Sequence, residues 1–158
     1  MLERTGRLVL TFPAGALPAF LDASAGGLAG KLVIDVLVPL AVDGRFFDVA
    51  PVPGARSAGE LIQLRAPTAR VVSAFKNLSA DRLRDLPTPL EGDVLIAGND
   101  PDARAEVAAL ARRLPQLRPV DCGRLANARF IEAITPLLLN LNRRHHARTS
   151  IGILGLPE

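Results

Sequence analysis

The sequence predicts an α/β domain with a mostly parallel sheet, flanking helices and a long C-terminal helix. Short apolar runs alternate along the chain with stretches whose apolar residues recur at helical spacing. The apolar runs show little alternation with polar residues, as expected for strands that are buried on both faces of a parallel sheet. A length of 158 residues with 49% apolar composition is enough for one compact domain with a core.

The predicted strands are short apolar runs bounded by residues that end strands. Proline follows the first two runs, at Pro13 and Pro39, where it fixes the backbone and removes a hydrogen-bond donor. Ordinary strand termination is one explanation of these prolines. Because ligands of open parallel sheets bind at the carboxyl ends of strands, a binding site is the other. Strands are expected at residues 8–12, 32–38, 69–75, 93–98 and 117–120, with a closing strand at 151–154, whereas residues 40–55 are expected to be irregular.

The predicted helices combine apolar residues at helical spacing with capping residues. Ser57 has Glu60 three positions later, which is the spacing of a capping box. Gly26-Gly27 is expected to close the first helix in the left-handed conformation that glycine accepts. In chain order, helices are expected at 16–25, from Ser57 through Leu64, at 79–83, from Asp100-Pro101 through Leu114, and at 124–144.

The last of these helices, residues 124–144, is apolar nearly all round. A helix of this kind is buried on more than one side. In so small a domain we expect the second side to contact another copy of the chain, which predicts a homodimer through this helix. The alternative is a helix at the centre of the core.

Composition argues against several classes of protein. The chain has no Trp, no Tyr and a net charge of only +3, so the aromatic and basic surface of a nucleic-acid-binding protein is not expected. No apolar run approaches the length of a membrane span, and a membrane partner is not expected either. Cys122 is the only cysteine, which excludes an internal disulfide and favours the cytoplasm. The adjacent His145 and His146 project in different directions on a helix, so no metal site is expected.

Four blocks of sequence resemble one known family. They are residues 71–80, 93–100, 117–129 and 131–142, which in this order and at this spacing are similar to NADPH:coenzyme F420 oxidoreductases. The likeness extends over residues 8–154. It implies a Rossmann-like fold that is truncated, because no Gly-x-Gly-x-x-Gly turn is present in the 158 residues.

The resemblance also implies cofactors and residue roles. In that family pattern, the loops at Phe12-Pro13 and Val38-Pro39 flank the nicotinamide of NADP. The loop Lys76-Asn77-Leu78 lies beside the deazaflavin ring of F420. Hydride passes directly between the two rings, so no catalytic acid, base or nucleophile is expected. A solvated loop lysine is the alternative for Lys76, and an ordinary turn residue is the alternative for Asn77.

The predicted organisation is one compact domain made of two halves. Residues 1–54 are expected to be the remnant of a dinucleotide-binding half, and residues 55–158 to form the deazaflavin and dimer half. Because the Gly-rich turn is absent, an oxidoreductase of this kind is expected either to have the missing half supplied by a partner chain or to bind the dinucleotide in an unusual way. The alternative function is a non-catalytic dimeric binding or assembly protein derived from the same family.

Overall fold

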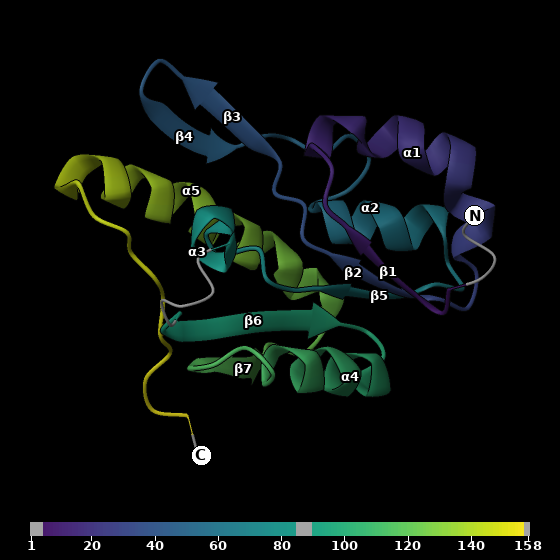
Figure 1. Cartoon of the computed structure of the whole chain (residues 1–158). Coiled ribbons are helices and arrows are strands. Elements are labelled where there is room, and N and C mark those ends of the chain that lie inside the picture. The colour runs from purple at the N-terminus through teal and green to yellow at the C-terminus, as the bar shows by residue number, and fades with distance from the viewer. Residues whose placement is uncertain (1–4, 85–89, 157–158) are drawn as a thin grey trace.

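The computed structural model describes residues 5–84 and 90–156 and shows a three-layer α/β/α domain (Figure 1). Its central sheet has five strands in the order β1-β2-β5-β6-β7. All neighbouring strands are parallel except β5 and β6. The predicted α/β class with a mostly parallel sheet is therefore confirmed. The five strands are β1 (Arg7–Leu10), β2 (Leu32–Asp35), β5 (Arg70–Ser73), β6 (Gly92–Gly98) and β7 (Leu117–Asp121).

Helices cover both faces of the sheet because alternate strand residues point to opposite sides. On one face, Val33 and Val71 pack with the residues of α1 and α2, while Leu95 and Val120 pack with α5. On the other face, α4 covers the sheet. The helices are α1 (Leu17–Ser24), α2 (Ala58–Arg65), α3 (Ala80–Arg84), α4 (Pro101–Ala111) and α5 (Ala128–His145), and the 3-10 turns are η2 (Ala14–Ala16), η3 (Ala25–Leu28) and η4 (Leu125–Asn127).

Two predicted helix starts are confirmed by their capping hydrogen bonds. The Ser57 hydroxyl accepts the backbone N–H of Glu60 at 3.1 Å and caps α2. The Asp100 carboxylate accepts the N–H groups of Asp102 and Ala103 at the start of α4. Both caps satisfy donors that have no partner inside the helix.

The stretch 40–55, predicted to be irregular, contains a β-hairpin instead. Strands β3 (Leu40–Asp43) and β4 (Phe46–Val49) pair antiparallel. Asp43 pairs with Phe46, which leaves a two-residue loop whose glycine, Gly44, has φ 56°. Glycine at the first position of such a loop matches the twist of the strands. Figure 1 shows the hairpin standing apart from the sheet and beside α5.

Two further predictions about local structure are wrong. Gly26 and Gly27 do not form a left-handed cap, because the chain continues from α1 into η3, and Gly30 takes the positive φ of 69°. Residues 151–154 do not form a strand. That segment is held beside β6 by side-chain and backbone hydrogen bonds. The Asp93 N–H donates to the carbonyl of Ile151 at 2.8 Å, the Asp93 carboxylate accepts the N–H of Ile153 at 2.6 Å, and Arg118 donates to the carbonyl of Ile153.

The sheet runs without interruption across residue 54. Strand β2 precedes that position, β5 follows it, and the two pair from Leu32 with Arg70 to Asp35 with Ser73. The assignment of residues 1–54 and 55–158 to different cofactors stays a prediction.

Candidate functional site

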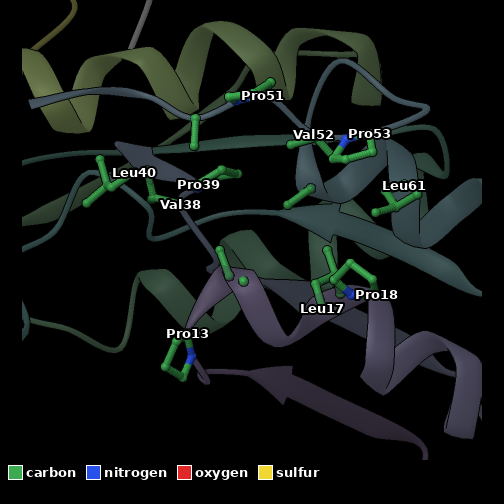
Figure 2. Close-up of a pocket in the computed structure, with 14 residues that line it drawn as sticks. Pro13, Leu17, Pro18, Val38, Pro39, Leu40, Pro51, Val52, Pro53 and Leu61 are labelled. Carbon is green, nitrogen blue, oxygen red and sulfur yellow. The ribbon is translucent and has the colours of Figure 1, made fainter. Parts of the chain in front are cut away.

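An apolar pocket of about 550 Å³ lies at the carboxyl ends of β1 and β2. The loop after β1 contributes Pro13, and the loop after β2 contributes Val38 and Pro39. Figure 2 shows how the labelled side chains surround the hollow between the start of α1, the loop after β2 and the segment after the hairpin. The full lining is Pro13, Ala14, Gly15, Leu17, Pro18, Val38, Pro39, Leu40, Ala50, Pro51, Val52, Pro53, Ala58 and Leu61. We call this cavity the proline-walled pocket.

The walls of this pocket are stiff for a local reason. Five of its lining residues are prolines, and each proline has a fixed φ and no N–H. The backbone N–H of Ala50 donates to the carbonyl of Pro39 at 2.9 Å, which closes the base of the β3–β4 hairpin beside the pocket. A volume of this size with an apolar lining is in the range of sites for small ligands and cofactors.

A buried cluster of three charged side chains lies behind the pocket wall. The Nζ atom of Lys76 is 2.7 Å from Asp35 Oδ2 and 2.9 Å from Glu132 Oε1, and all three side chains are fully buried. Lys76 also donates to the carbonyl oxygen of Leu37. Since a buried charge needs a partner, these contacts explain how the lysine is accommodated. We call Asp35, Lys76 and Glu132 the ion cluster.

The ion cluster holds two walls of the proline-walled pocket. Asp35 Oδ1 accepts the N–H of Leu37 at 3.0 Å, so both backbone groups of that residue are tied to the cluster, directly before Val38. Glu132 Oε1 accepts the N–H of Ala58, the first residue of α2 and part of the pocket lining, at 3.0 Å. The cluster therefore fixes the loop after β2 and the start of α2 relative to each other.

Glu132 is the most unusual member of the ion cluster. Burial raises the pKa of its carboxyl group above the usual range, although the charge of Lys76 partly opposes this effect. Its Oε2 atom is buried and has no hydrogen-bond partner among the described residues. A proton on this oxygen is the form that burial favours.

Gly59 is required by the same cluster. A Cβ atom at this position would lie 2.4 Å from Ser73 Oγ and 3.0 Å from Asp35 Oδ2. The Ser73 hydroxyl donates to Asp35 Oδ2 at 2.7 Å, so the added carbon would displace a buried hydrogen bond. The glycine lets α2 approach the end of β2 closely.

The structure places the predicted site residues in different surroundings. Pro13, Val38 and Pro39 line the proline-walled pocket. Phe12 is not among the lining residues; it packs against Phe20, with ring centroids 5.0 Å apart, at the edge of the core. Lys76 is buried in the ion cluster, so the alternative of a solvated loop lysine is wrong.

Asn77 and Leu78 line a second, more polar pocket of about 690 Å³. The Nδ2 atom of Asn77 donates to the carbonyl of Asp93 at 2.7 Å, which ties the loop after β5 to β6. Phe75, the second residue after β5, has φ 60°, a strained value for a residue other than glycine. This turn directs Lys76 inward and leaves Asn77 and Leu78 beside the second pocket.

Other candidate chemistry is weak in the described part of the chain. Burial raises the pKa of the Cys122 thiol, which favours the unreactive protonated form over a thiolate. The residues that the structure describes include no group of three or more metal-ligating side chains. No helix in the described ranges has the length and apolar character needed to cross a membrane.

The fold and the pocket together define a class of protein. A parallel sheet between layers of helices, with a cavity at the carboxyl ends of its strands, is the arrangement by which α/β domains bind nucleotides and ring cofactors. Comparisons with known proteins give the family.

Curated relatives that match most of the chain include enzymes named F420-dependent NADP reductase. An F420-dependent NADP reductase of Methanothermobacter marburgensis is 38% identical over 156 residues, which cover 95% of this chain and 69% of the relative. An F420-dependent NADP reductase of Methanocaldococcus jannaschii is 40% identical over 133 residues, covering 82% of this chain and 59% of the relative. No protein-family model matches the chain.

A solved structure agrees with these relatives. The crystal structure of a provisionally named F420-dependent NADP reductase from Arthrobacter sp. FB24 matches with a TM-score of 0.83 and 27% identity. The match covers 98% of this chain and 71% of that one. The chain belongs to the F420-dependent NADP reductase family, as its sequence blocks predict. It spans only 59% to 71% of these proteins' lengths, so the activity of the whole enzyme does not follow from the family name alone.

Sequence reasoning missed most of what lies behind the pocket. Asp35 ends an apolar strand and Glu132 lies in an apolar helix, and a charged residue in such a setting is rarely buried without a partner. That signal predicts buried partners but does not identify them. The segment 50–53 was missed as a pocket wall because it follows a hairpin that was itself not predicted.

Proposed function

We propose that this chain is the part of an NADP- and F420-dependent oxidoreductase in which the nicotinamide ring occupies the proline-walled pocket. One observation carries the proposal: the pocket lies at the carboxyl ends of β1 and β2 and brings Pro13, Val38 and Pro39 together. These are the residues that the family resemblance associates with the nicotinamide. The names of the relatives supply the two coenzymes.

The protein's contribution is position and exclusion of water. The reduced nicotinamide supplies a hydride, two electrons with one proton, and the deazaflavin ring accepts it and takes a second proton from solvent. The prolines hold the pocket walls at fixed backbone angles, and the apolar lining keeps water from the ring. The hydrogen bonds of the ion cluster hold the loop after β2 and the start of α2 at fixed relative positions.

A pocket-filling variant tests this proposal. Gly15 lines the proline-walled pocket, and a Cβ built there meets no atom within 4 Å. Gly15→Leu is therefore expected to fold normally and to narrow the site. Gly26→Leu is the matched control, because Gly26 is equally open but does not line the pocket.

The measurement is reduction of oxidised F420 by NADPH, followed through the absorbance of the deazaflavin. We expect the wild-type chain and Gly26→Leu to transfer hydride at similar rates and Gly15→Leu to lose at least tenfold. Equal rates in all three proteins would place the nicotinamide elsewhere. Transfer that appears only when a second chain is added would favour a partner that supplies the grip on the dinucleotide phosphates.

We further propose that two copies of the chain associate through α5. Phe130, Ala133 and Leu137 share one face of this helix, because positions i, i+3 and i+7 coincide on a helix. All three are exposed, Phe130 by 58% and Leu137 by 56%, and together form an apolar stripe. A two-fold axis along such a stripe would bury it against itself.

The oligomeric state tests this association. Light scattering is expected to give twice the chain mass for the wild type and for Leu110→Glu, whose side chain lies on α4 and is also exposed. Leu137→Glu should halve the mass, since it places a charge within the stripe. A monomeric wild type, or a Leu137→Glu variant of unchanged mass, would refute the α5 interface.

A non-catalytic dimeric binding or assembly protein is the second candidate. The observation that favours it is the exposed apolar stripe of α5, which supports association of two copies without any coenzyme. This candidate predicts dimerisation without hydride transfer under any combination of coenzymes and partner chains. Hydride transfer by the wild type would eliminate it.

A further inference from the structure

The ion cluster is connected to the lining of the proline-walled pocket at two places. Glu132 Oε1 is 3.0 Å from the N–H of Ala58, and Ala58 lines the pocket. Lys76 binds the carbonyl of Leu37, and the next residue, Val38, lines the pocket. A change of charge in the buried cluster is therefore expected to be felt by a ring that the pocket holds, because charges interact more strongly in the protein interior than in water.

The cluster contains one carboxyl group more than it has cations. Asp35 and Glu132 face the single ammonium group of Lys76. When both acids are ionised the cluster carries a net charge of −1, and when Glu132 holds a proton it is neutral. The orphaned Oε2 atom is where that proton fits, because it has no other partner among the described residues.

In the described part of the chain, the charged side chains of α2, β6 and β4 do not add a second cation to the ion cluster. On α2, Glu60 is turned to the Ser57 hydroxyl at 3.2 Å. On β6, Asp93 is paired with Arg118 at 2.8 Å. On β4, Asp48 is exposed and accepts the N–H of Val49. Burial raises the pKa of Glu132, and among the charges Lys76 lowers it and Asp35 raises it.

We propose that Glu132 is a proton-linked counter-charge for a cationic ring in the proline-walled pocket. With the pocket empty or holding a neutral ring, Glu132 keeps its proton and the cluster is neutral. With a positively charged ring in the pocket, Glu132 releases its proton to solvent and the cluster carries the opposing charge. This inference rests on the proposed function, because it needs a nicotinamide in this pocket.

For the reaction, this proposal predicts that pH changes the relative affinity of the pocket for the oxidised and the reduced coenzyme. A reduced nicotinamide ring is neutral, and loss of a hydride to the deazaflavin leaves the ring with a charge of +1. Binding of an oxidised ring is then coupled to release of part of a proton from Glu132, in the pH range where this group titrates. The oxidised coenzyme should bind more tightly as pH rises through the Glu132 titration, and the reduced coenzyme should not.

The test uses two small rings that need no phosphate grip. 1-Methylnicotinamide is a permanent cation, and nicotinamide is neutral. The chain labelled with carbon-13 at the glutamate carboxyl carbon gives six glutamate signals at most, and the one lost in Glu132→Gln identifies Glu132. Gln keeps an acceptor for Ala58 and Lys76 but cannot ionise, so the variant should fold.

We expect the Glu132 signal to titrate above the usual range of a glutamate carboxyl group, because burial raises its pKa. Saturating 1-methylnicotinamide should lower its midpoint by about one pH unit, a tenfold change in proton affinity, and nicotinamide should leave the midpoint in place. In Glu132→Gln, the affinity for the cation should lose its dependence on pH over the same range.

The experiment distinguishes failure of the counter-charge from failure of the proposed function. Backbone amide signals of Val38 and Ala58 report whether either ring occupies the pocket. Saturable shifts of these amides with an unmoved Glu132 midpoint would overturn the counter-charge and leave the proposed function standing. If neither ring shifts the amides, the nicotinamide position is refuted, and the counter-charge falls with it.

Discussion

Replacing Lys76 by methionine tests the ion cluster as the element that holds the site together. Methionine has a similar length and no charge, so Asp35 and Glu132 would keep their buried positions and lose their cation. Removal of one partner of a buried ion pair typically costs about 3–5 kcal/mol, because it leaves an uncompensated buried charge. In a domain of this size, that cost corresponds to a fall in Tm of about 6–20 °C.

Lys31 provides a matched control, because it is the only other lysine in the chain. It lies at an exposed site where its Nζ atom donates to the carbonyl of Thr5 at 2.8 Å. Lys31→Met should therefore change the free energy of unfolding by no more than about 0.5 kcal/mol. Urea unfolding followed by circular dichroism measures both variants.

The pH dependence sharpens this test. The loss in Lys76→Met should shrink as pH falls, because Glu132, whose pKa is raised by burial, takes up a proton and the buried negative charge decreases. A double variant with Glu132→Gln should recover part of the lost stability. A Lys76→Met protein that unfolds with the same free energy as Lys31→Met would refute the reasoning, since Lys76 would then not neutralise buried charge.

Three further predictions concern packing, acid stability and the hairpin. Gly59→Ala should lower the free energy of unfolding by about 1–3 kcal/mol in chemical denaturation, because its Cβ would lie 2.4 Å from a buried side-chain oxygen, while Gly26→Ala should be near neutral. Arg118 lowers the pKa of Asp93, so the stability from this carboxylate is present above its unfolded pKa and is lost as pH falls through the lower folded value. An acid-unfolding series should therefore show a shallower loss of stability below about pH 4 in Asp93→Asn than in the wild type; equal slopes would contradict the assignment. Asn140→Ala should release the hairpin from α5, because the Asn140 side chain accepts from the Phe47 N–H at 2.9 Å and donates to the Phe47 carbonyl at 2.8 Å, and faster hydrogen exchange confined to β3 and β4 is the expected signature.

The sequence predicts the sheet well because its strands bury both faces. An apolar run such as 93–98 is typical of a strand that is buried on both faces, and the structure has β6 at Gly92–Gly98. The sequence does not predict the hairpin because its strands are short and largely exposed, and because the first of them directly continues the apolar stretch of the preceding strand. Gly44, the first residue of the two-residue loop, is a known hairpin signal that was available in the sequence.

The sequence predicts part of the pocket but does not predict the ion cluster. Proline at the ends of two strands predicts the edge of the sheet where Pro13 and Pro39 meet, because parallel strands end on the same side. No local pattern pairs Lys76 with Glu132, which is 56 residues away along the chain. Their contact depends on how α5 packs over the end of β2, and that packing is a property of the whole fold.

The most direct test of the central claim is a crystal structure of the chain soaked with NADP. We predict density for the nicotinamide ring in the proline-walled pocket, between Pro13 and the Val38-Pro39 loop, with the segment 50–53 on its far side. A nicotinamide found in the second pocket, beside Asn77 and Leu78, would contradict the account.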